Sequence, residues 1–413
     1  MKKRVVVTGM GSVTALGHNT AQLWDAVKAG KSGVGKITHF DTTDYACNIA
    51  AEVKDFDAKA VLGKEARKMD RFSQFAVAAA IEAMDDAGLS AGSYDPERLG
   101  VIIGNGIGGH TTEEESHKAL LEKGPTRLPP MTIPKIISNI APGNIAIMLN
   151  AQGPCYTITT ACSSGTDAIG AALNTIRAGQ ADIVITGGTE AAITPFGIAG
   201  FIVIQALSTG FNDTPEKASR PFDKDRDGFV MGEGAGVLIL ESLEHAKARG
   251  AHIYAEVAGY GMTCDANHLT APHPEGVGAA RAMKLALEDA DLKPEDIDYI
   301  NAHGTSTPLN DPLETLAIKK AFGEHAYKLK VSSTKSMTGH CIGAAGGIEA
   351  ILTVMAIKEG FVPPTINLDE PDPKCDLDYV PNVGQNLKVR AAMSETLGFG
   401  GHNGVIVLKE YTE

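Results

Sequence analysis

Three side chains in this sequence are of types that work together in nucleophilic catalysis. The first, Cys162, lies between a β-rich run over 156–160 and a run that predicts a helix apolar nearly all round, and hence buried. Unpaired N–H groups and the dipole at the start of such a helix favour thiolate over thiol. The stretch therefore predicts a nucleophile, although on its own it fits a small core cysteine equally well. Cys155, inside the strand run, is predicted to be structural.

Two histidines shift this balance. His303 follows a strand predicted over 297–302, at the carboxyl end where ligands gather in parallel sheets. His340 lies in the connection between a strand and a second apolar helix over 344–360. When the glycines that end the two apolar helices are superposed, His340 comes close to the position equivalent to Cys162. Cysteine nucleophiles work with nearby imidazole, so the three residues together favour chemistry over isolated polar side chains.

A buried charge supports the same location. Glu349 interrupts the second apolar helix, where an unpaired carboxylate is costly. The nearest candidate partner is Lys335, in the loop that carries His340. The pattern predicts a Lys335–Glu349 ion pair beside the reactive groups.

The elements that hold these residues occur twice. Each apolar helix ends in a glycine, residues 4–11 resemble residues 254–261, and a glycine turn feeding an apolar strand recurs near the end of each half. Two similar βαβα halves that meet face to face are the simplest explanation. We therefore predict an α/β fold in which residues 1–250 carry the nucleophile and residues 251–413 carry the two histidines.

Composition limits the possible functions. The 413 residues include 43% hydrophobic residues and 46 glycines, enough for a sizeable core and too many for one simple domain. The 6 cysteines lack C-x-x-C spacing, which indicates neither a disulfide framework nor a zinc site and fits a cytoplasmic location. A net charge of −13 argues against nucleic acid as the partner. The sequence contains no evident export signal or membrane-spanning run.

Two motifs match ligand-binding patterns poorly. Residues 104–109 form G-x-G-x-x-G after a strand, but the acidic residues at 113–115 come too early to contact a ribose. The alternative is a glycine turn that lets backbone pack closely. The run over 223–228 imitates the start of an EF-hand, but Gly234 stands where the closing glutamate belongs. We expect no nucleotide, calcium or other metal.

Basic residues cluster in one short run. Lys64, Arg67, Lys68 and Arg71 recur at helical spacing. Most such runs are solvated helix faces. In so acidic a chain, a local basic face also suits docking of an acidic partner, and the sequence leaves both interpretations open.

Four motifs together resemble one known family. They are T-A-C-S-S-G around Cys162, N-A-H-G-T-S-T-P around His303, S-S-T-K-S-M-T-G-H ending at His340, and G-F-G-G-H-N-G around Phe399. In this order they are similar to the β-ketoacyl-acyl-carrier-protein synthases of fatty-acid biosynthesis, above all the type II elongating enzymes, and the similarity runs from the first strand to the last. The resemblance implies the thiolase fold, five αβαβα layers built from two related halves, and usually a homodimer.

The resemblance also implies a reaction. Cys162 would hold an acyl group as a thioester, while His303 and His340 would promote decarboxylation of malonyl-carrier and stabilise the enolate. The acyl groups would arrive on the phosphopantetheine arm of acyl carrier protein, without a metal or redox cofactor. Backbone N–H groups of Cys162 and Phe399 would form the oxyanion hole, the pair of donors for the negative oxygen of the tetrahedral intermediates.

Further roles follow from the same resemblance. Lys335 and Glu349 would order the site. Carrier docking would use Lys64, Arg67 and Lys68. Substrate-binding positions are implied for Thr305 and Thr307 on the pantetheine arm, for Ile107 in the acyl pocket, and for Thr270.

Some positions depart from the commonest family pattern. They are Leu397, His402, Cys341 and Gln205, which bear on chain-length preference and carrier contact. The alternatives to an elongating synthase are a coenzyme A-dependent thiolase relative, a polyketide-type ketosynthase, and a chain-length-determining partner subunit that has lost the nucleophile. His340 and the Lys335 loop argue against the first of these, and an intact Cys162 argues against the last.

Overall fold

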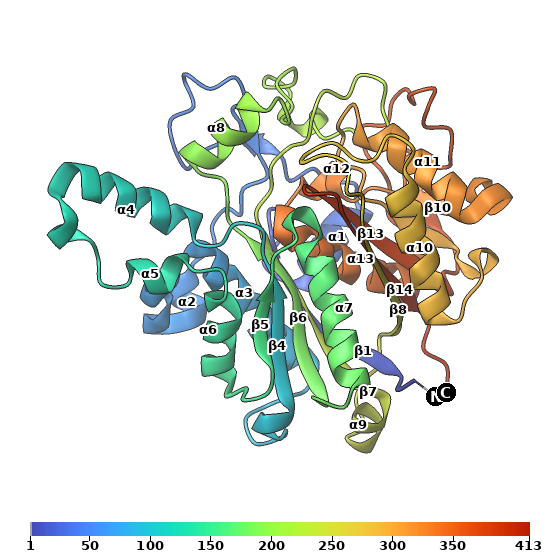
Figure 1. The fold of residues 1–413 in the computed structure, drawn as a ribbon, viewed down its shortest axis with the longest axis horizontal. Helices are drawn as coiled ribbons and strands as arrows, with labels where there is room; N and C mark the ends of the chain where they lie inside the picture. The colour runs from blue at the N-terminus through green and yellow to red at the C-terminus, as the bar shows by residue number, and fades with distance from the viewer. Residues whose placement is uncertain (1) are drawn as a thin grey trace.

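The computed structural model describes residues 2–413, and its framework is one mixed sheet of 10 strands (Figure 1). The strands follow the order β10-β9-β13-β14-β8-β1-β7-β6-β4-β5. Their bounds are β1 Val5–Thr14, β4 Leu99–Gly104, β5 Cys155–Ile158, β6 Ile183–Glu190, β7 Gly234–Ser242, β8 Ala255–Cys264, β9 Tyr299–Asn301, β10 Lys330–Ser332, β13 Ala391–Gly398 and β14 His402–Lys409. Two short pairs lie outside it, β2 Gly35–Lys36 with β3 Ile49–Ala50 and β11 Phe361–Val362 with β12 Gln385–Asn386.

The two halves of this sheet have the same topology. Counted within its own half, each set of five strands runs in the order third, second, fourth, fifth, first. In both halves the third and fourth strands flank the second in parallel, and the fifth is antiparallel to the fourth. The first strands, β1 and β8, pair at Val6 with Glu256 and at Val7 with Ala255. The predicted repeat is confirmed, and the halves also join edge to edge.

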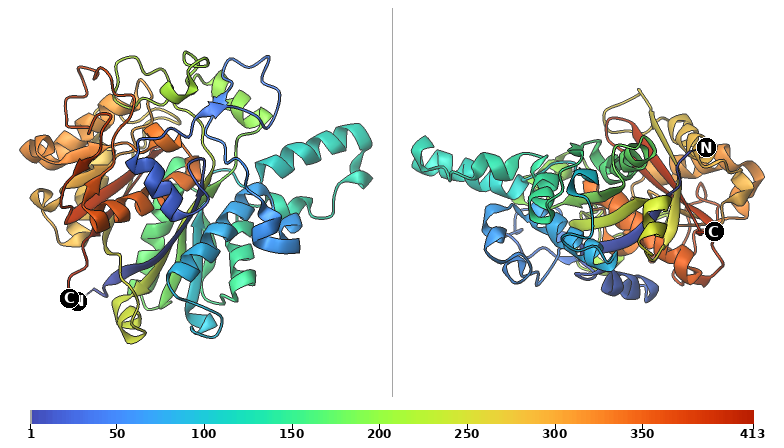
Figure 2. Two further views of the ribbon diagram at one scale, coloured as in Figure 1. Left: turned by 180° about the vertical axis from the view of Figure 1, so that it is seen from behind. Right: turned by 90° about the horizontal axis from the view of Figure 1, so that it is seen from below.

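The structure has the predicted five layers, in which each half of the sheet forms one β layer and helices form the other three (Figures 1 and 2). The middle layer holds α7 (Ser164–Arg177) and α13 (Ala345–Glu359); the outer layers hold α3 (Arg71–Asp86) with α6 (Ile140–Leu149), and α10 (Val277–Ala290) with α11 (Asn310–Phe322). The remaining helices are α1 Thr20–Lys28, α2 Ala58–Leu62, α4 His110–Lys123, α5 Thr132–Ile136, α8 Pro195–Val203, α9 Leu243–Ala248 and α12 Lys335–Thr338.

The middle layer is the core of the molecule because its helices are apolar on nearly all sides. Ile169, Leu173, Ile348 and Ile351 are each at most 1% exposed and pack in one cluster with strands of both halves. Each such fully buried side chain contributes roughly 1.5–3 kcal/mol. The burial predicted for both apolar runs is confirmed.

Glycines bring the starts of the two central helices into contact. A Cβ atom at Gly165 would lie 2.9 Å from the amide nitrogen of Gly347, and one at Gly346 would lie 2.3 Å from that of Thr166. Side chains do not approach backbone so closely, so bare backbone is needed on both helices. The contact places the turn before α7, which holds Cys162, beside the loop before α13.

An arm formed by α4 and α5 projects from the layered body (Figure 1). On it, Leu121 and Ile133 are 82% and 65% exposed.

Cys155, expected to be structural, is exposed because β5 is an edge strand of the sheet. No helix within residues 2–413 is both long and apolar enough to cross a membrane.

Candidate active site

One cavity of about 540 Å³ contains the reactive side chains predicted from the sequence. Cys162 enters it from the first half of the chain, whereas His303 and His340 enter it from the second. The other predicted residues that line it are Ile107, Thr270, Thr305, Thr307 and Phe399. Leu397 and Gln205, which depart from the family pattern, also line this cavity.

Cys162 lies on a tight turn, the 3₁₀ segment Ala161–Ser163, between β5 and α7. Ala161 has a φ of +51°, in the left-handed region that residues with a side chain seldom adopt. The Ser164 hydroxyl holds this turn, since it accepts a hydrogen bond from the Thr160 N–H (2.9 Å) and donates one to the Ala161 carbonyl (2.6 Å). The predicted strand, turn and helix are confirmed.

The protonation state of Cys162 differs from the prediction. Burial raises the pKa of its thiol to about 12, and Glu190 raises it further. The Lys335 ammonium and a hydrogen bond from the Phe399 N–H oppose this shift without overcoming it. The helix start was expected to yield a thiolate, but loss of water from the sulfur outweighs that contribution. Cys162 therefore rests as a thiol and needs a base.

This protonation state can be measured. The ultraviolet absorbance of thiolates, taken as the difference between the native chain and Cys162→Ala, should show no ionisation step between pH 6 and about pH 10, because a thiol with a pKa of about 12 stays protonated there. A step near pH 7 would mean that the helix start determines the charge after all. The Cys162→Ala reference removes the contribution of the other cysteines.

The two imidazoles can supply the base. Their ring centroids lie 5.3 Å apart, with the planes at 87°. Burial lowers the pKa of both His303 and His340 well below the ordinary histidine value, and the Lys335 ammonium lowers it further. Both rings are therefore neutral at physiological pH. A neutral imidazole can accept a thiol proton or donate a hydrogen bond to an anionic oxygen.

Backbone contacts fix the segments that carry the two rings. The N–H groups of His303 and Gly304 donate to the two carboxylate oxygens of Glu314 at 2.6 and 2.8 Å. The His340 N–H donates to the Val230 carbonyl at 2.7 Å. Glu314 is fully buried on α11, so this anchor is shielded from water.

Lys335 and Glu349 form the predicted ion pair, and their side chains are only 1% and 2% exposed. Burial raises the pKa of Glu349 to about 7, and the Lys335 ammonium opposes that rise. The same ammonium acts on Cys162 and on both imidazoles. The pair therefore sets the charge balance of the whole cavity.

Phe399 follows β13 in a glycine-rich turn that packs directly on the Cys162 turn. A Cβ atom at Gly398 would lie 2.8 Å from the Thr160 carbonyl, so only glycine allows this approach. The Phe399 N–H hydrogen-bonds the Cys162 sulfur, and its ring lies 6.4 Å from that of Phe201. This turn and the start of α7 thus present backbone donors to the same atom.

The remaining predicted binding residues lie along the cavity. The hydroxyls of Thr305 and Thr307 are 3.3 Å apart, and that of Thr307 accepts from the Asn310 N–H at 3.2 Å. Thr270 lies on an exposed loop that borders the cavity. Ile107 forms part of its apolar wall.

The glycine motif at 104–109 surrounds a carboxylate of the chain itself. The N–H groups of Gly106 and Gly108 donate to Glu190 at 2.7 and 3.4 Å, and that of Gly343 at 3.2 Å. Burial raises the pKa of Glu190 to about 7, while these amides oppose the shift. Because an internal carboxylate occupies the amides, the motif holds the cavity wall together and leaves no place for a nucleotide phosphate.

Two of these anchors were not predicted. Glu190 ends a buried strand, and Glu314 lies in a helix with buried faces. A charged residue within an otherwise apolar strand or helix indicates a buried partner, as it did for Glu349. Their partners are backbone amides distant in sequence, which no local pattern indicates.

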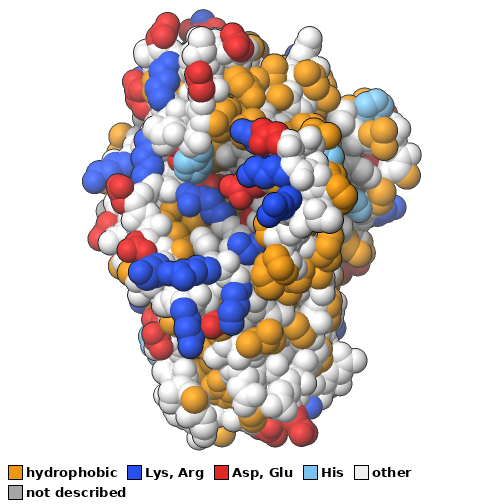
Figure 3. Space-filling model, turned by 90° about the vertical axis from the view of Figure 1, so that its left-hand side faces the viewer, with side chains coloured by type: hydrophobic (Ala, Val, Ile, Leu, Met, Phe, Trp, Pro, Cys, Tyr) orange, Lys and Arg blue, Asp and Glu red, His pale blue; other side chains and the backbone are white. Residues whose placement is uncertain are grey.

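The predicted basic cluster separates into two environments. Lys64, Arg67 and Lys68 are exposed in the 3₁₀ segment Gly63–Lys68, and Lys68 pairs with Glu65 at 2.8 Å. Arg71, by contrast, is half-buried and pairs with buried Glu233 at 2.7 Å. Figure 3 shows Lys and Arg side chains among apolar patches on the side from which α4 projects. Three basic residues thus remain available to a partner.

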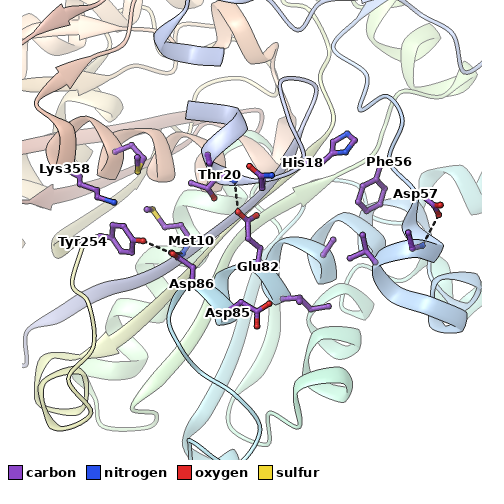
Figure 4. Close-up of a pocket in the computed structure, with 17 residues that line it drawn as sticks. Met10, His18, Thr20, Phe56, Asp57, Glu82, Asp85, Asp86, Tyr254 and Lys358 are labelled. Atoms are coloured by element: carbon purple, nitrogen blue, oxygen red, sulfur yellow. Dashed lines mark hydrogen bonds between the residues drawn. The ribbon is translucent and has the colours of Figure 1, made fainter. Parts of the chain in front are cut away.

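A second cavity, of about 670 Å³, lies between α1, α2, α3 and α13 (Figure 4). Two of its carboxylates have structural partners: Glu82 accepts from the Thr20 N–H and Asp86 from the Tyr254 hydroxyl, both at 2.8 Å. None of the Cys-His-His set lines it. The predicted reactive side chains therefore line the first cavity and not this one.

Comparison with known proteins identifies the family. Residues 2–246 match the model of the β-ketoacyl synthase N-terminal domain, and residues 254–369 match that of the β-ketoacyl synthase C-terminal domain. The chain belongs to the β-ketoacyl synthase family. The family and the ketoacyl-synthase class of enzyme predicted from the four motifs are thereby confirmed.

This synthase has similar relatives along its whole length. It is 56% identical over 411 residues to 3-oxoacyl-[acyl-carrier-protein] synthase 2 of Synechocystis sp., with 99% of both chains covered. It is 53% identical over 410 residues to the protein of the same name from Staphylococcus aureus strain COL, again with 99% of both chains covered.

Solved structures share the fold of this synthase. The ishigamide ketosynthase/chain length factor superposes with a TM-score of 0.93 at 39% identity, with 100% of both chains covered. A type II PKS ketosynthase bound to the hexaketide, in complex with its acyl-carrier protein, superposes with a TM-score of 0.92 at 37% identity and the same coverage. The predicted ketosynthase fold is confirmed.

Proposed function

We propose that this chain is an elongating 3-oxoacyl-[acyl-carrier-protein] synthase. It joins an acyl group held on Cys162 to the two-carbon unit of malonyl-carrier, with loss of CO₂. The observation that carries this proposal is that one cavity holds the Cys162 thiol together with two neutral imidazoles. The relatives named 3-oxoacyl-[acyl-carrier-protein] synthase 2, at 53% and 56% identity, support it.

In the first half-reaction, the Cys162 thiol gives its proton to a neutral imidazole, and the sulfur attacks the carbonyl carbon of the acyl thioester. The Cys162 and Phe399 N–H groups stabilise the oxygen that becomes negative. The bond between that carbon and the pantetheine sulfur then breaks. The departing thiolate takes up the proton, which leaves an acyl group on Cys162 and a free carrier thiol.

In the second half-reaction, malonyl-carrier loses its carboxylate as CO₂, and the electron pair of the broken bond remains as an enolate. His303 and His340 donate hydrogen bonds to the enolate oxygen. The enolate carbon attacks the acyl group on Cys162, the bond to the sulfur breaks, and the thiolate regains a proton from solvent. Each step balances with these substrates and side chains, so we propose that no metal or redox cofactor takes part.

We further propose that the partners are acyl carrier protein and a second copy of this chain, in the cytoplasm. A ketosynthase at 37% identity is described in complex with its acyl-carrier protein, which supports the first partner. An edge strand, β5, that exposes Tyr156 supports the second, because such edges invite pairing with another chain. Sedimentation equilibrium of the full chain measures this association.

The reaction is tested with purified chain, acyl-carriers of graded length and malonyl-carrier. We expect a 3-oxoacyl-carrier two carbons longer, CO₂ in equal amount, and an acyl adduct on the peptide that contains Cys162. Labelling at Cys341 instead would contradict the assignment. Repeated extension of one chain to a polyketide would favour the polyketide-type alternative, and turnover with acyl-coenzyme A alone would favour the thiolase relative.

Carrier docking gives a separate prediction. Reversing charge at Lys64 and Arg67, as Lys64→Glu with Arg67→Glu, should raise the KM for acyl-carrier about tenfold at low salt with little change in kcat, because rim charges steer association. The effect should shrink as salt screens the charges. Arg281→Glu with Lys284→Glu is the matched control, since both residues are exposed on α10 in the other half. Equal effects of both changes would mean that the cluster is only a solvated surface.

A further inference from the structure

A partly buried hydrogen bond joins the second half of the chain to the helix that follows the Cys162 turn. Tyr260, on β8, donates its hydroxyl to the Asp167 carboxylate in the first turn of α7 at 2.8 Å. A Cβ atom at Gly170 would lie 2.4 Å from the Tyr260 ring, so the ring lies directly on the helix. Asp167 is only 2% exposed. None of the steps proposed above uses either residue.

The Asp167 carboxylate also hydrogen-bonds residues on both sides of Cys162. It accepts a hydrogen bond from the Thr160 hydroxyl at 2.5 Å and another from the Ser163 hydroxyl. Thr160 and Ser163 lie two residues before and one residue after Cys162. The carboxylate thus fixes both ends of the segment whose N–H groups face the reacting atoms.

The same group reaches the second oxyanion-hole donor. The Ser163 hydroxyl lies 3.0 Å from that of Thr396, on β13 three residues before Phe399. The β14 backbone closes the other side, because a Cβ atom at Gly404 would lie 2.5 Å from Asp167 Oδ1. His402, one of the departures from the family pattern, adds a favourable electrostatic contribution to this carboxylate. These contacts thus join the Cys162 turn, β13 and the β14 backbone.

We propose that Tyr260 and Asp167 are positioning residues that align the two backbone donors of the oxyanion hole. The Tyr260 hydroxyl orients the Asp167 carboxylate, and this carboxylate orients the hydroxyls of Thr160 and Ser163. The Ser163 hydroxyl in turn contacts Thr396 and so holds β13 in position. Burial raises the pKa of Asp167, while the hydrogen bonds from Thr160, Tyr260 and Ser163 favour its charged form. This inference rests on the proposed function, because an oxyanion hole matters only if Cys162 is acylated.

The test compares two tyrosines with the same contact. Tyr260→Phe removes a hydroxyl that donates to Asp167 at 2.8 Å, and Tyr254→Phe removes one that donates to Asp86 at 2.8 Å in the second cavity (Figure 4). We expect Tyr260→Phe to lower the rate of Cys162 acylation about tenfold at unchanged KM for acyl-carrier, a fraction of the effect of deleting a whole oxyanion-hole donor. Tyr254→Phe should stay within about twofold of the native rate.

A second readout separates alignment from general loosening. Malonyl decarboxylation in a Cys162→Gln background uses the imidazoles and no acyl-enzyme, so adding Tyr260→Phe should leave that rate unchanged. Equal acylation rates in Tyr260→Phe and Tyr254→Phe would overturn the inference. So would a loss of decarboxylation, on adding Tyr260→Phe to Cys162→Gln, as large as the loss of acylation. Absence of decarboxylation in Cys162→Gln alone would instead count against the proposed function. Asp167→Asn replaces the acceptor of the same hydrogen bonds and should lower the acylation rate at least as much as Tyr260→Phe does.

Discussion

Replacing Cys162 by alanine should abolish condensation, because no acyl-enzyme can form without the sulfur. The expected loss exceeds about a thousandfold, and only side reactions of malonyl-carrier should remain. Intact-mass spectrometry after incubation with acyl-carrier should show no adduct, whereas the native chain should gain one acyl group. The fold should persist, since Cys162 is only partly buried and alanine fits its space.

Cys162→Gln sharpens this test. The side chain cannot be acylated, but its amide fills the place of an acylated sulfur, so decarboxylation of malonyl-carrier by His303 and His340 should continue. Cys155→Ala is the matched control, because Cys155 is exposed on β5 away from the cavity. If Cys155→Ala lost condensation and Cys162→Ala kept it, the nucleophile would be wrongly identified.

Removing one member of the buried ion pair should give the second large effect. Glu349→Ala leaves the Lys335 ammonium without a partner at 1% exposure, and we expect the free energy of unfolding to fall by about 3–5 kcal/mol. Condensation should fall with it. Denaturant titration of the purified chain measures the first effect, and carrier turnover measures the second.

A double replacement separates stability from activity. Lys335→Met with Glu349→Leu removes both charges at similar volume and should recover most of the lost stability. Activity should not recover, because the Lys335 ammonium lowers the pKa of both imidazoles. Without it their pKa values rise, so the acid limb of the profile of kcat/KM against pH should move to higher pH. An unchanged profile would mean that the pair serves only to hold the fold.

The sequence predicted those parts of the molecule that follow from local pattern. Apolar runs indicated the two central helices, glycines marked their ends, and a charge inside one run indicated the Lys335–Glu349 pair. His340 could be placed beside Cys162 because their elements repeat, and His303 because it follows the carboxyl end of a strand. The four motifs extended this to the family, and through it to the residues that line the cavity.

What could not be predicted depends on neighbours distant in the chain. The thiol state of Cys162 results from packing that removes water from the sulfur, which a helix start alone does not indicate. Arg71 is held against the body of the molecule, apart from the exposed basic residues, because Glu233 lies opposite it. Asp167 meets Tyr260 only because β8 of one half packs on α7 of the other. Each of these contacts joins residues whose approach no short pattern encodes.

The glycine contact between α7 and α13 has an evolutionary consequence. Gly165 and Gly346 lie directly against the opposing helix, where an added Cβ atom would come within 2.9 Å of the Gly347 amide nitrogen and 2.3 Å of the Thr166 amide nitrogen. Substitution at either position can only widen the gap between nucleophile and imidazole. Selection for turnover should therefore keep glycine at both positions. Adaptation to new substrates should instead occur by substitution of the residues that line the cavity.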